Sequence, residues 1–371
     1  MITLILKGTD GCNLNCAYCS LGEKTSHHVI SEEMLFESLC YVCRMAQRRG
    51  EPRITVILHG GEPTLVPAEE YRNAFTTIQR EFPDISVTIS VQTNAFHISS
   101  EMFQFFRDFH AAVGVSIDGS QKIHDGERKS CSGKNTFSQV WENIGRLQEQ
   151  GNSVSCLMVL TGAALREPLD YLHDFADRHL HLKINPLLQY GEAVKNPQLF
   201  LKPGEYAEYL IRVYEYILAE RIELTVSPLD KILQAVLTEK QIRECTFDAQ
   251  CSRSFLCIDW KGDIYPCGKF SDIHAFCLGN VKDRDTELLQ TPQLKRLLER
   301  RCSALPEACR TCSFLEICHA GCSAEAVIEG AFDQPTALCS DYQRLFCYFQ
   351  GDGLRYFKKH LLERKRELLG M

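Results

Sequence analysis

Six short apolar runs alternate with longer amphipathic stretches over the first 225 residues. The apolar runs are Ile2–Leu6, Ile54–Leu58, Ile85–Gln92, Ala112–Ile117, Val154–Leu160 and Leu182–Pro186. The amphipathic stretches are Glu32–Arg48, Ala68–Glu81, Glu101–Phe109, Thr136–Glu149 and Glu167–His179. This alternation predicts an α/β fold with a parallel sheet and right-handed crossovers. Six units fit an open partial (β/α)6 barrel better than a closed eight-fold one, with reactive groups on the loops after the strands.

The residue pattern of the chain changes after this region. A helix over Gly204–Ala219 and a strand near Glu223–Val226 close it. From Lys240 the chain is dense in Cys, Gly and Asp, which predicts short strands and loops. A helix over Asp341–Leu369 follows, with a break at Gly351 and Gly353. We therefore predict a barrel over 1–225, a connection over 226–244, a cysteine-rich domain over 245–345 and a C-terminal helix over 346–371.

The composition excludes several classes of partner. The chain has a formal charge of −7 and is 44% hydrophobic and 24% charged. A net negative charge gives no reason to expect nucleic acid or an anionic membrane as a partner. No signal peptide and no apolar run of membrane-spanning length is visible, so we expect a cytoplasmic protein. Thiols stay reduced there, so the 19 cysteines indicate metal binding rather than disulfides.

Three cysteines, Cys12, Cys16 and Cys19, lie on one short loop after the first predicted strand. Three thiolates can ligate three irons of a [4Fe–4S] cluster and leave the fourth iron open. A structural zinc site would need a fourth protein ligand. The CxxxCxxC spacing, with an aromatic residue before the last cysteine, resembles the radical S-adenosylmethionine (SAM) superfamily, and the resemblance places Tyr18 at the cofactor. From the triad alone, zinc or a fortuitous spacing stays an alternative.

The turn after the second predicted strand is His59-Gly60-Gly61-Glu62-Pro63, which looks like the GGE motif of that superfamily. Glycines let the backbone approach a ligand closely, and the Glu62 carboxylate can bind the methionine ammonium of SAM. Taken alone, these residues would be an ordinary turn. Their place after the second strand favours cofactor binding. We interpret His59, and His124 further along the chain, as structural.

Polar clusters also follow the third and fourth predicted strands. The resemblance implies that four residues contact the ribose and methionine carboxylate of SAM: Thr93, Asn94, Ser116 and Asp118. The alternative is that Asn94 and Asp118 only form Asx turns. Arg128 is a candidate clamp for a carboxylate because its guanidinium is planar and donates in pairs. An ordinary surface arginine is the alternative at that position.

Eight further cysteines form two interleaved sets whose spacing resembles the SPASM extension, which carries two auxiliary [4Fe–4S] clusters. The resemblance implies a first set of Cys245, Cys251, Cys267 and Cys322, and a second set of Cys309, Cys312, Cys318 and Cys339. Cys257 could replace Cys245, or the first site could stay open for substrate. A zinc ribbon is the alternative to clusters. We interpret the remaining eight cysteines, including Cys40, Cys43 and Cys156, as small buried apolar residues.

A barrel with a SPASM domain resembles two groups of enzymes, the maturases of ribosomally made peptides and the anaerobic sulfatase-maturing enzymes. In the second group an aspartate follows the cysteine that corresponds to Cys267 and serves as a base, whereas Gly268 stands in this chain. We therefore favour a peptide maturase that uses a 5′-deoxyadenosyl radical to form a carbon–carbon link, as in a cyclophane, or a thioether. Formylglycine formation from Cys or Ser is the alternative. Asp259 and Asp263 are candidate bases, although both suit strand–turn positions.

The resemblance further implies the cofactors and partners. We expect SAM, three [4Fe–4S] clusters, and a flavodoxin or ferredoxin as reductant. The auxiliary clusters would relay an electron, ligate substrate or serve a structural role. Because the cluster loop begins almost at once, we expect the precursor peptide to be bound by the barrel mouth and SPASM domain or by a separate leader-binding protein. A non-enzymatic zinc- or cluster-binding interaction protein would need neither Gly60–Glu62 nor SAM turnover.

Overall fold

The computed structural model describes residues 1–21, 27–242, 244–283 and 288–368. The chain divides into two compact units. Unit 1 contains Met1–Leu157, Tyr190–Pro197 and Gln250–Glu299, and unit 2 contains Met158–Gln189, Gln198–Ala249 and Arg300–Met371. These units cut across the predicted barrel and cysteine-rich segments, because strands from both segments share one sheet in unit 1. Within the described ranges, no helix combines the length and apolar character needed to cross a membrane.

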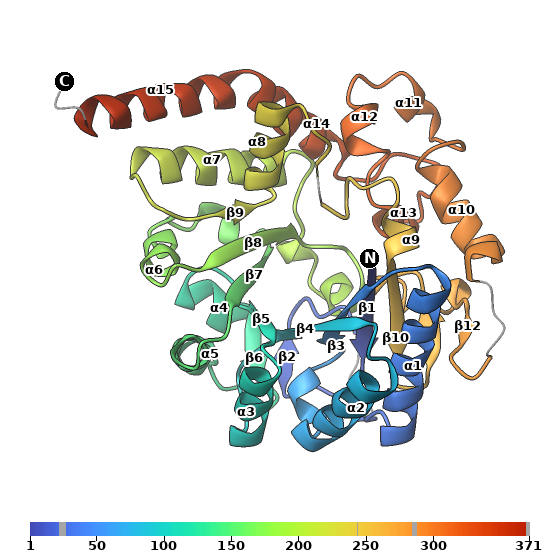
Figure 1. Ribbon diagram of the computed structural model, residues 1–371. Helices are drawn as coiled ribbons and strands as arrows, with labels where there is room; N and C mark the ends of the chain where they lie inside the picture. The colour runs from blue at the N-terminus through green and yellow to red at the C-terminus, as the bar shows by residue number, and fades with distance from the viewer. Residues whose placement is uncertain (22–26, 243, 284–287, 369–371) are drawn as a thin grey trace. The chain divides into compact units, whose positions relative to one another are not determined.

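Five parallel strands form the centre of the sheet in unit 1 (Figure 1). Their order is β1 (Ile2–Lys7), β3 (Arg53–His59), β4 (Ser86–Thr93), β5 (Ala112–Ser116) and β7 (Val154–Leu160), the last paired through Leu157. All five correspond to predicted apolar runs. In β1, Leu4 and Leu6 are fully buried and alternate with the half-buried Ile5, the period of two expected for a strand with one face in the core.

Helices connect these strands. α1 (Glu32–Arg48) and α2 (Ala68–Glu81) have the predicted bounds. α3 (Ser100–Asp108) differs from its prediction by one residue at each end, and α5 (Phe137–Glu149) by one residue at its start. Two of the helices start at serine caps: the Ser31 hydroxyl accepts a hydrogen bond from the N–H of Met34, and Ser99 does the same for Met102. The short helix α4 (Gln121–Glu127) was not predicted, because seven residues show no clear period.

A strand from the cysteine-rich region extends this sheet. β10 (Phe255–Asp259) pairs in parallel with β1, and the antiparallel strands β11 (Asp263–Tyr265) and β12 (Gly279–Asn280) continue to the edge. This pairing explains why unit 1 includes Gln250–Glu299. The sequence gives no local sign of it, since the two paired strands lie far apart along the chain.

A second, two-stranded sheet in unit 1 holds the cysteine triad. β2 (Leu14–Cys16) pairs antiparallel with β6 (Arg128–Ser130), so that Cys16 lies opposite Arg128. Each strand has only three residues and was not predicted. The pairing anchors the cysteine-bearing loop to the segment after α4.

Unit 2 contains a short parallel strand pair and most of the C-terminal helices. β8 (His181–Pro186) pairs with β9 (Val226–Ser227). The longer helices are α6 (Tyr171–Asp177), α7 (Glu205–Ala219), α8 (Leu229–Thr238), α14 (Cys339–Gln350) and α15 (Asp352–Leu368). α14 packs against α7 and α8 (Figure 1), and its Leu345 and Phe349 are fully buried. The predicted C-terminal helix is interrupted at Gly351, whereas Gly353, the other predicted break, lies inside α15. Its last predicted residue, Leu369, lies outside the described residues.

Two predictions in this part of the chain differ from the structure. α6 starts later than predicted because Pro168 disfavours a helical conformation at Glu167, which is extended. The region after Lys240 contains the predicted short strands β10–β12, but much of the rest is short helices. These are α9 (Cys251–Ser254), α10 (Pro292–Arg300), α11 (Glu307–Arg310), α12 (Leu315–Cys318) and α13 (Ser323–Ile328).

Candidate active site and cysteine centres

The triad loop (Gly11–Cys19) brings its three predicted ligands together. Cys12 and Cys16 are each 8% exposed and pack with the fully buried Leu14, and Cys19 lies against the same group. The N–H of Leu14 donates to the Cys12 sulfur at 3.4 Å. Three neighbouring thiols on one buried loop fit three corners of a [4Fe–4S] cluster.

The two glycines after β3 are required by this loop. A Cβ on Gly60 would lie 2.4 Å from the carbonyl oxygen of Thr9, and one on Gly61 would lie 1.9 Å from that of Gly11. The N–H groups of Gly61 and Glu62 donate to those same two carbonyl oxygens at 2.8 Å. The sequence predicts that the glycines admit a ligand, but what they approach most closely is backbone: Gly60 approaches Thr9, just before the triad loop, and Gly61 approaches Gly11 at its start. The turn and the loop therefore form one structure.

Glu62 joins the turn to the end of β4. Its carboxylate is 1% exposed and accepts hydrogen bonds from the hydroxyls of Thr93 at 2.6 Å and Thr64 at 2.8 Å, and from the N–H of Asn94 at 2.7 Å. Burial raises the pKa of Glu62, although these hydrogen bonds oppose the shift. The amide of Asn94 also donates to the Cys12 sulfur at 3.7 Å. Thr93 and Asn94 thus connect Glu62 to the triad loop.

Asn94 and Ser116 have additional local partners. The side-chain oxygen of Asn94 accepts from the N–H of Phe96 at 2.9 Å, which is the Asx turn considered as the alternative. The Ser116 hydroxyl accepts from the amide of Gln92 at 2.9 Å. Contacts from these residues to a cofactor remain predictions.

Tyr18, Asp118 and Arg128 form a buried network with one another. The Tyr18 hydroxyl donates to the Asp118 carboxylate, and Nη1 of Arg128 donates to the same hydroxyl at 2.6 Å. Nη1 also lies 3.6 Å from Asp118. Arg128 is only 7% exposed, so the alternative of an ordinary surface arginine is wrong.

His59 and His124 have structural partners. Nδ1 of His59 accepts from the N–H of Gly60 at 2.8 Å, and Nδ1 of His124 accepts from the N–H of Asp118 at 3.2 Å. Burial lowers the pKa of each imidazole to about 4. Both rings are therefore neutral at pH 7 and serve as hydrogen-bond partners.

The two candidate bases lie in the hairpin between β10 and β11. Asp259 accepts hydrogen bonds from the N–H groups of Lys261 at 2.9 Å and Asp263 at 3.0 Å. Asp263 accepts from the side-chain amide of Asn280 at 2.9 Å. These bonds give both carboxylates the strand–turn role that was their alternative.

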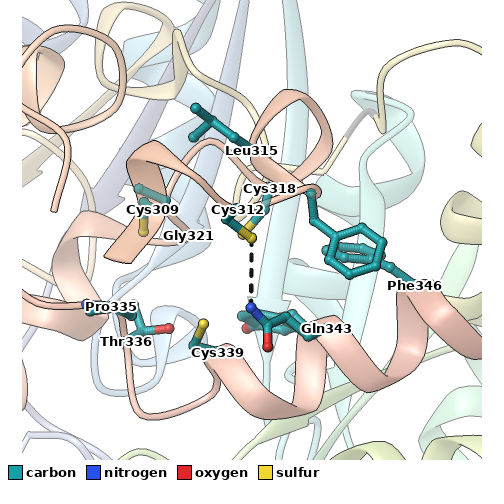
Figure 2. A pocket seen from close by; sticks show the side chains of 13 residues that line it. Cys309, Cys312, Leu315, Cys318, Gly321, Pro335, Thr336, Cys339, Gln343 and Phe346 are labelled. Atoms are coloured by element: carbon teal, nitrogen blue, oxygen red, sulfur yellow. Dashed lines mark hydrogen bonds between the residues drawn. The ribbon is translucent and has the colours of Figure 1, made fainter. Parts of the chain in front are cut away.

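The second set of predicted auxiliary ligands lines one pocket in unit 2, the four-cysteine pocket: Cys309, Cys312, Cys318 and Cys339 (Figure 2). Burial raises the pKa of the Cys318 thiol to about 12. The amide of Gln343, one turn beyond Cys339 on α14, donates to the Cys312 sulfur at 3.6 Å. Among the described residues, no three His, Cys, Asp or Glu side chains converge tightly enough to hold a single ion. Four thiols around one pocket match the number of ligands that a [4Fe–4S] cluster takes, and their role as cluster ligands stays a prediction.

Arg300 ties the chain together around this pocket. It is 1% exposed, and it donates to the carbonyl oxygens of Phe332 at 2.7 Å, Ala320 at 2.9 Å and Gln334 at 2.8 Å. Sequence reasoning missed this residue, because an arginine at the end of the amphipathic α10 resembles a solvated helix end. One buried guanidinium therefore links the end of α10 to two later segments of the chain through hydrogen bonds to three carbonyl oxygens.

The first set of auxiliary ligands is divided between the two units. Cys251, at the start of α9, and Cys267, after β11, belong to unit 1, whereas Cys245 and Cys322 belong to unit 2. Cys257 is fully buried inside β10, and burial raises the pKa of its thiol to about 12. This set remains a prediction.

The prediction that the remaining eight cysteines are all buried holds for only four of them. Cys40, Cys43, Cys156 and Cys257 are buried, but Cys131, Cys302 and Cys347 are exposed and Cys277 is half-buried. The prediction is wrong for these last four.

Comparisons with known proteins identify two families along the chain. Residues 6–175 match the radical SAM superfamily, and residues 245–313 match the SPASM iron–sulfur cluster-binding domain. The first match contains the triad and the strand ends described above, and the second contains five of the eight predicted auxiliary ligands.

Several relatives match over most of their length. The serine-type anaerobic sulfatase-maturating enzyme of Bacteroides thetaiotaomicron is 24% identical over 95% of this chain and 90% of its own. The cysteine-type enzyme of Clostridium perfringens is 26% identical over 86% of this chain and 88% of its own.

Two solved structures show the same fold. Native anSMEcpe with bound AdoMet has a TM-score of 0.82 at 23% identity and covers 97% of this chain and 99% of its own. Streptococcus suis SuiB bound to precursor peptide SuiA has a TM-score of 0.65 at 14% identity and covers 91% of this chain and 75% of its own. The radical SAM match over residues 6–175, the SPASM match over residues 245–313 and the sulfatase-maturating relatives set the non-enzymatic alternative aside, and the chain is a radical SAM enzyme with a SPASM domain.

Proposed function

We propose that the protein is a peptide maturase that abstracts a hydrogen atom from a side chain of a ribosomally made precursor peptide and oxidatively forms a cross-link. The observation that carries the proposal is the triad loop, hydrogen-bonded to the Gly60–Glu62 turn in a chain that also has a SPASM domain. The relatives support a peptide or protein substrate, because their names describe sulfatase maturation and one related structure contains a precursor peptide.

The proposed cofactors are SAM and three [4Fe–4S] clusters, one at the triad and two at the SPASM cysteines. When bound, the triad cluster and SAM supply a 5′-deoxyadenosyl radical, with an electron from a flavodoxin or ferredoxin. We propose that Glu62 binds the ammonium of SAM, since a buried carboxylate makes strong charge-assisted hydrogen bonds. Thr93 and Asn94 hold Glu62 in place, and the low exposure of Cys12 and Cys16 excludes water.

The product assignment depends on the residue after Cys267. Gly268 carries no side chain that could accept a proton, and Asp259 and Asp263 are engaged in the hairpin turn. This departure from the sulfatase maturases favours cross-linking. A separate leader-binding protein would then help to present the precursor peptide.

Oxidation of Cys or Ser to formylglycine is a second candidate function. It is favoured by the sulfatase-maturating relatives, which match this chain from end to end more closely than SuiB does. One difference at position 268 separates the two candidates.

Anaerobic reconstitution followed by iron analysis and product analysis tests both. We expect about twelve irons per chain, as three four-iron clusters require, and 5′-deoxyadenosine formation from SAM. The enzyme is then incubated with short peptides encoded beside its gene and with sulfatase-derived Cys and Ser peptides. Loss of two hydrogens, with fragmentation blocked between two side chains, supports cross-linking.

The opposite outcomes are equally clear. A hydrazide-reactive aldehyde on a sulfatase peptide would replace the proposal with the second candidate. A fully loaded protein that forms no 5′-deoxyadenosine with any of these peptides would exclude both.

A further inference from the structure

A pair of opposite charges lies buried behind the triad loop. Arg128 is 7% exposed and Asp118 is fully buried, and Tyr18, itself 8% exposed, bridges them through its hydroxyl. Buried charged pairs are costly and give little net stability. Their position beside the cysteine loop therefore calls for an explanation other than stability.

The backbone fixes the distance from this network to the cysteines. Cys16 of β2 pairs with Arg128 of β6, and the N–H of Ala17 donates to the carbonyl of Glu127 at 2.8 Å. Tyr18 follows on the same loop, and the guanidinium carbon of Arg128 lies 5.8 Å from the centre of its ring. The ladder holds the backbone of Arg128 opposite Cys16, and the contacts with Tyr18 and Asp118 hold its guanidinium.

The charge of Arg128 is permanent and poorly screened. A guanidinium is protonated at any physiological pH, and Arg128 is only 7% exposed, so water screens its charge poorly. Within the described structure, the buried Nε of Arg128 has no hydrogen-bond partner, so its positive charge is only partly offset by protein acceptors.

We propose that Arg128 and Asp118 are positioning residues that set the reduction potential of the cluster held by Cys12, Cys16 and Cys19. Reduction adds an electron, so a buried cation beside Cys16 stabilises the reduced cluster and raises its potential. Asp118 offsets part of that effect, and Tyr18 holds the two charges in place. This role differs from the SAM contacts expected for these residues, and it rests on the proposed function because it needs a cluster at the triad.

Matched substitutions separate charge from structure. Asp118→Asn keeps the shape and can still accept from Tyr18, Arg128→Gln removes the cation, and Arg128→Lys keeps it. Each full-length protein is reconstituted anaerobically and titrated by EPR before SAM is added. The triad cluster is identified as the one whose signal changes when SAM is then supplied.

The expected shifts have opposite signs. The midpoint potential falls in Arg128→Gln, rises in Asp118→Asn and stays close to wild type in Arg128→Lys. A purely structural role would lower iron content or thermal stability in these variants without opposite shifts in potential.

Two results would overturn the inference: unchanged potentials in Arg128→Gln and Asp118→Asn, or shifts in the same direction. If Arg128→Gln does not retain iron, the test rests on the midpoint potential of Asp118→Asn, which should be higher than that of Arg128→Lys. A wild-type protein with no SAM-responsive cluster would instead contradict the proposed function, so the two failures are distinguishable.

Discussion

In the triad loop, Cys12, Cys16 and Cys19 come from one short stretch, whereas the cysteines of the four-cysteine pocket are spread over residues 309–339. The loop is held by the β2–β6 ladder and by the glycine turn, which are independent of any metal. The pocket is built from the four-residue helices α11 and α12, the start of α14 and the hydrogen bonds of Arg300. The first site is therefore fixed by the fold, and the second depends more on its own cluster to keep its shape.

The surroundings of the sulfurs differ as well. In the triad loop, a buried amide donates to the Cys12 sulfur, and Arg128, which is paired with Asp118, lies opposite Cys16 in the β2–β6 ladder. In the pocket, burial raises the pKa of Cys309, Cys318 and Cys339, and the side-chain donor Gln343 is exposed. The loop is arranged to control a reaction at its cluster, whereas thiols in the pocket must lose protons before a cluster can bind.

Single cysteine substitutions give the largest contrast between the two sites. Cys16→Ser removes a triad ligand, so we expect about four irons to be lost and 5′-deoxyadenosine formation to fall below detection. Cys339→Ser removes a pocket ligand, so a similar loss of iron leaves SAM cleavage measurable but lowers the melting temperature. Iron analysis, chromatography of 5′-deoxyadenosine and calorimetry measure these effects.

Cys302→Ser is the matched control, because Cys302 is exposed, lies near the pocket in the sequence and is not a predicted ligand. It is expected to keep wild-type iron content and melting temperature. The contrast fails if Cys339→Ser abolishes SAM cleavage as completely as Cys16→Ser does.

Adding one methyl group to the glycine turn disturbs only the triad. In Gly61→Ala the new Cβ would meet the Gly11 carbonyl at 1.9 Å, so the turn must separate from the loop. We expect loss of the SAM-responsive cluster, with the SPASM clusters retained. Gly126→Ala in α4 is the control, since a Cβ there meets nothing within 4 Å, and alanine favours a helix by about 0.5–1 kcal/mol over glycine. Equal iron loss in both variants would argue against the special role of the turn.

The smallest expected effect is the shift in cluster potential when either amide that donates to a cysteine sulfur is removed. Hydrogen bonds to cysteine sulfurs raise cluster potentials, so Asn94→Leu and Gln343→Leu should each lower one. The shift should be larger for the buried Asn94 than for the exposed Gln343, because water can replace the amide of Gln343. EPR-monitored titration measures both, and Gln350→Leu on the same helix as Gln343 should change neither potential. A larger shift from Gln343 than from Asn94 would reverse the comparison.

The sequence predicts the parts of this molecule that repeat a regular period. α1 and α2 have the predicted bounds because their apolar positions recur every three to four residues and Ser31 marks the start of α1. The triad and the pocket cysteines could be found because ligand spacing is local. Arg128, Tyr18 and Asp118 were each identified as candidates, but the network that they form was not, since the contact between Arg128 and Tyr18 joins positions 110 residues apart. Arg300 was missed because burial of an arginine depends on tertiary contacts alone.

The pairing of β10 with β1 has a consequence for synthesis of the chain. β1 leaves the ribosome long before one of its two neighbours in the sheet, which is made only when residues 255–259 emerge. Until then the edge of β1 presents unpaired N–H and C=O groups, which can pair with other chains. Contacts between such distant segments also form slowly. Truncation before residue 255 should therefore yield an aggregation-prone barrel, and the cysteine-rich region protects the edge of the strand that leads into the triad.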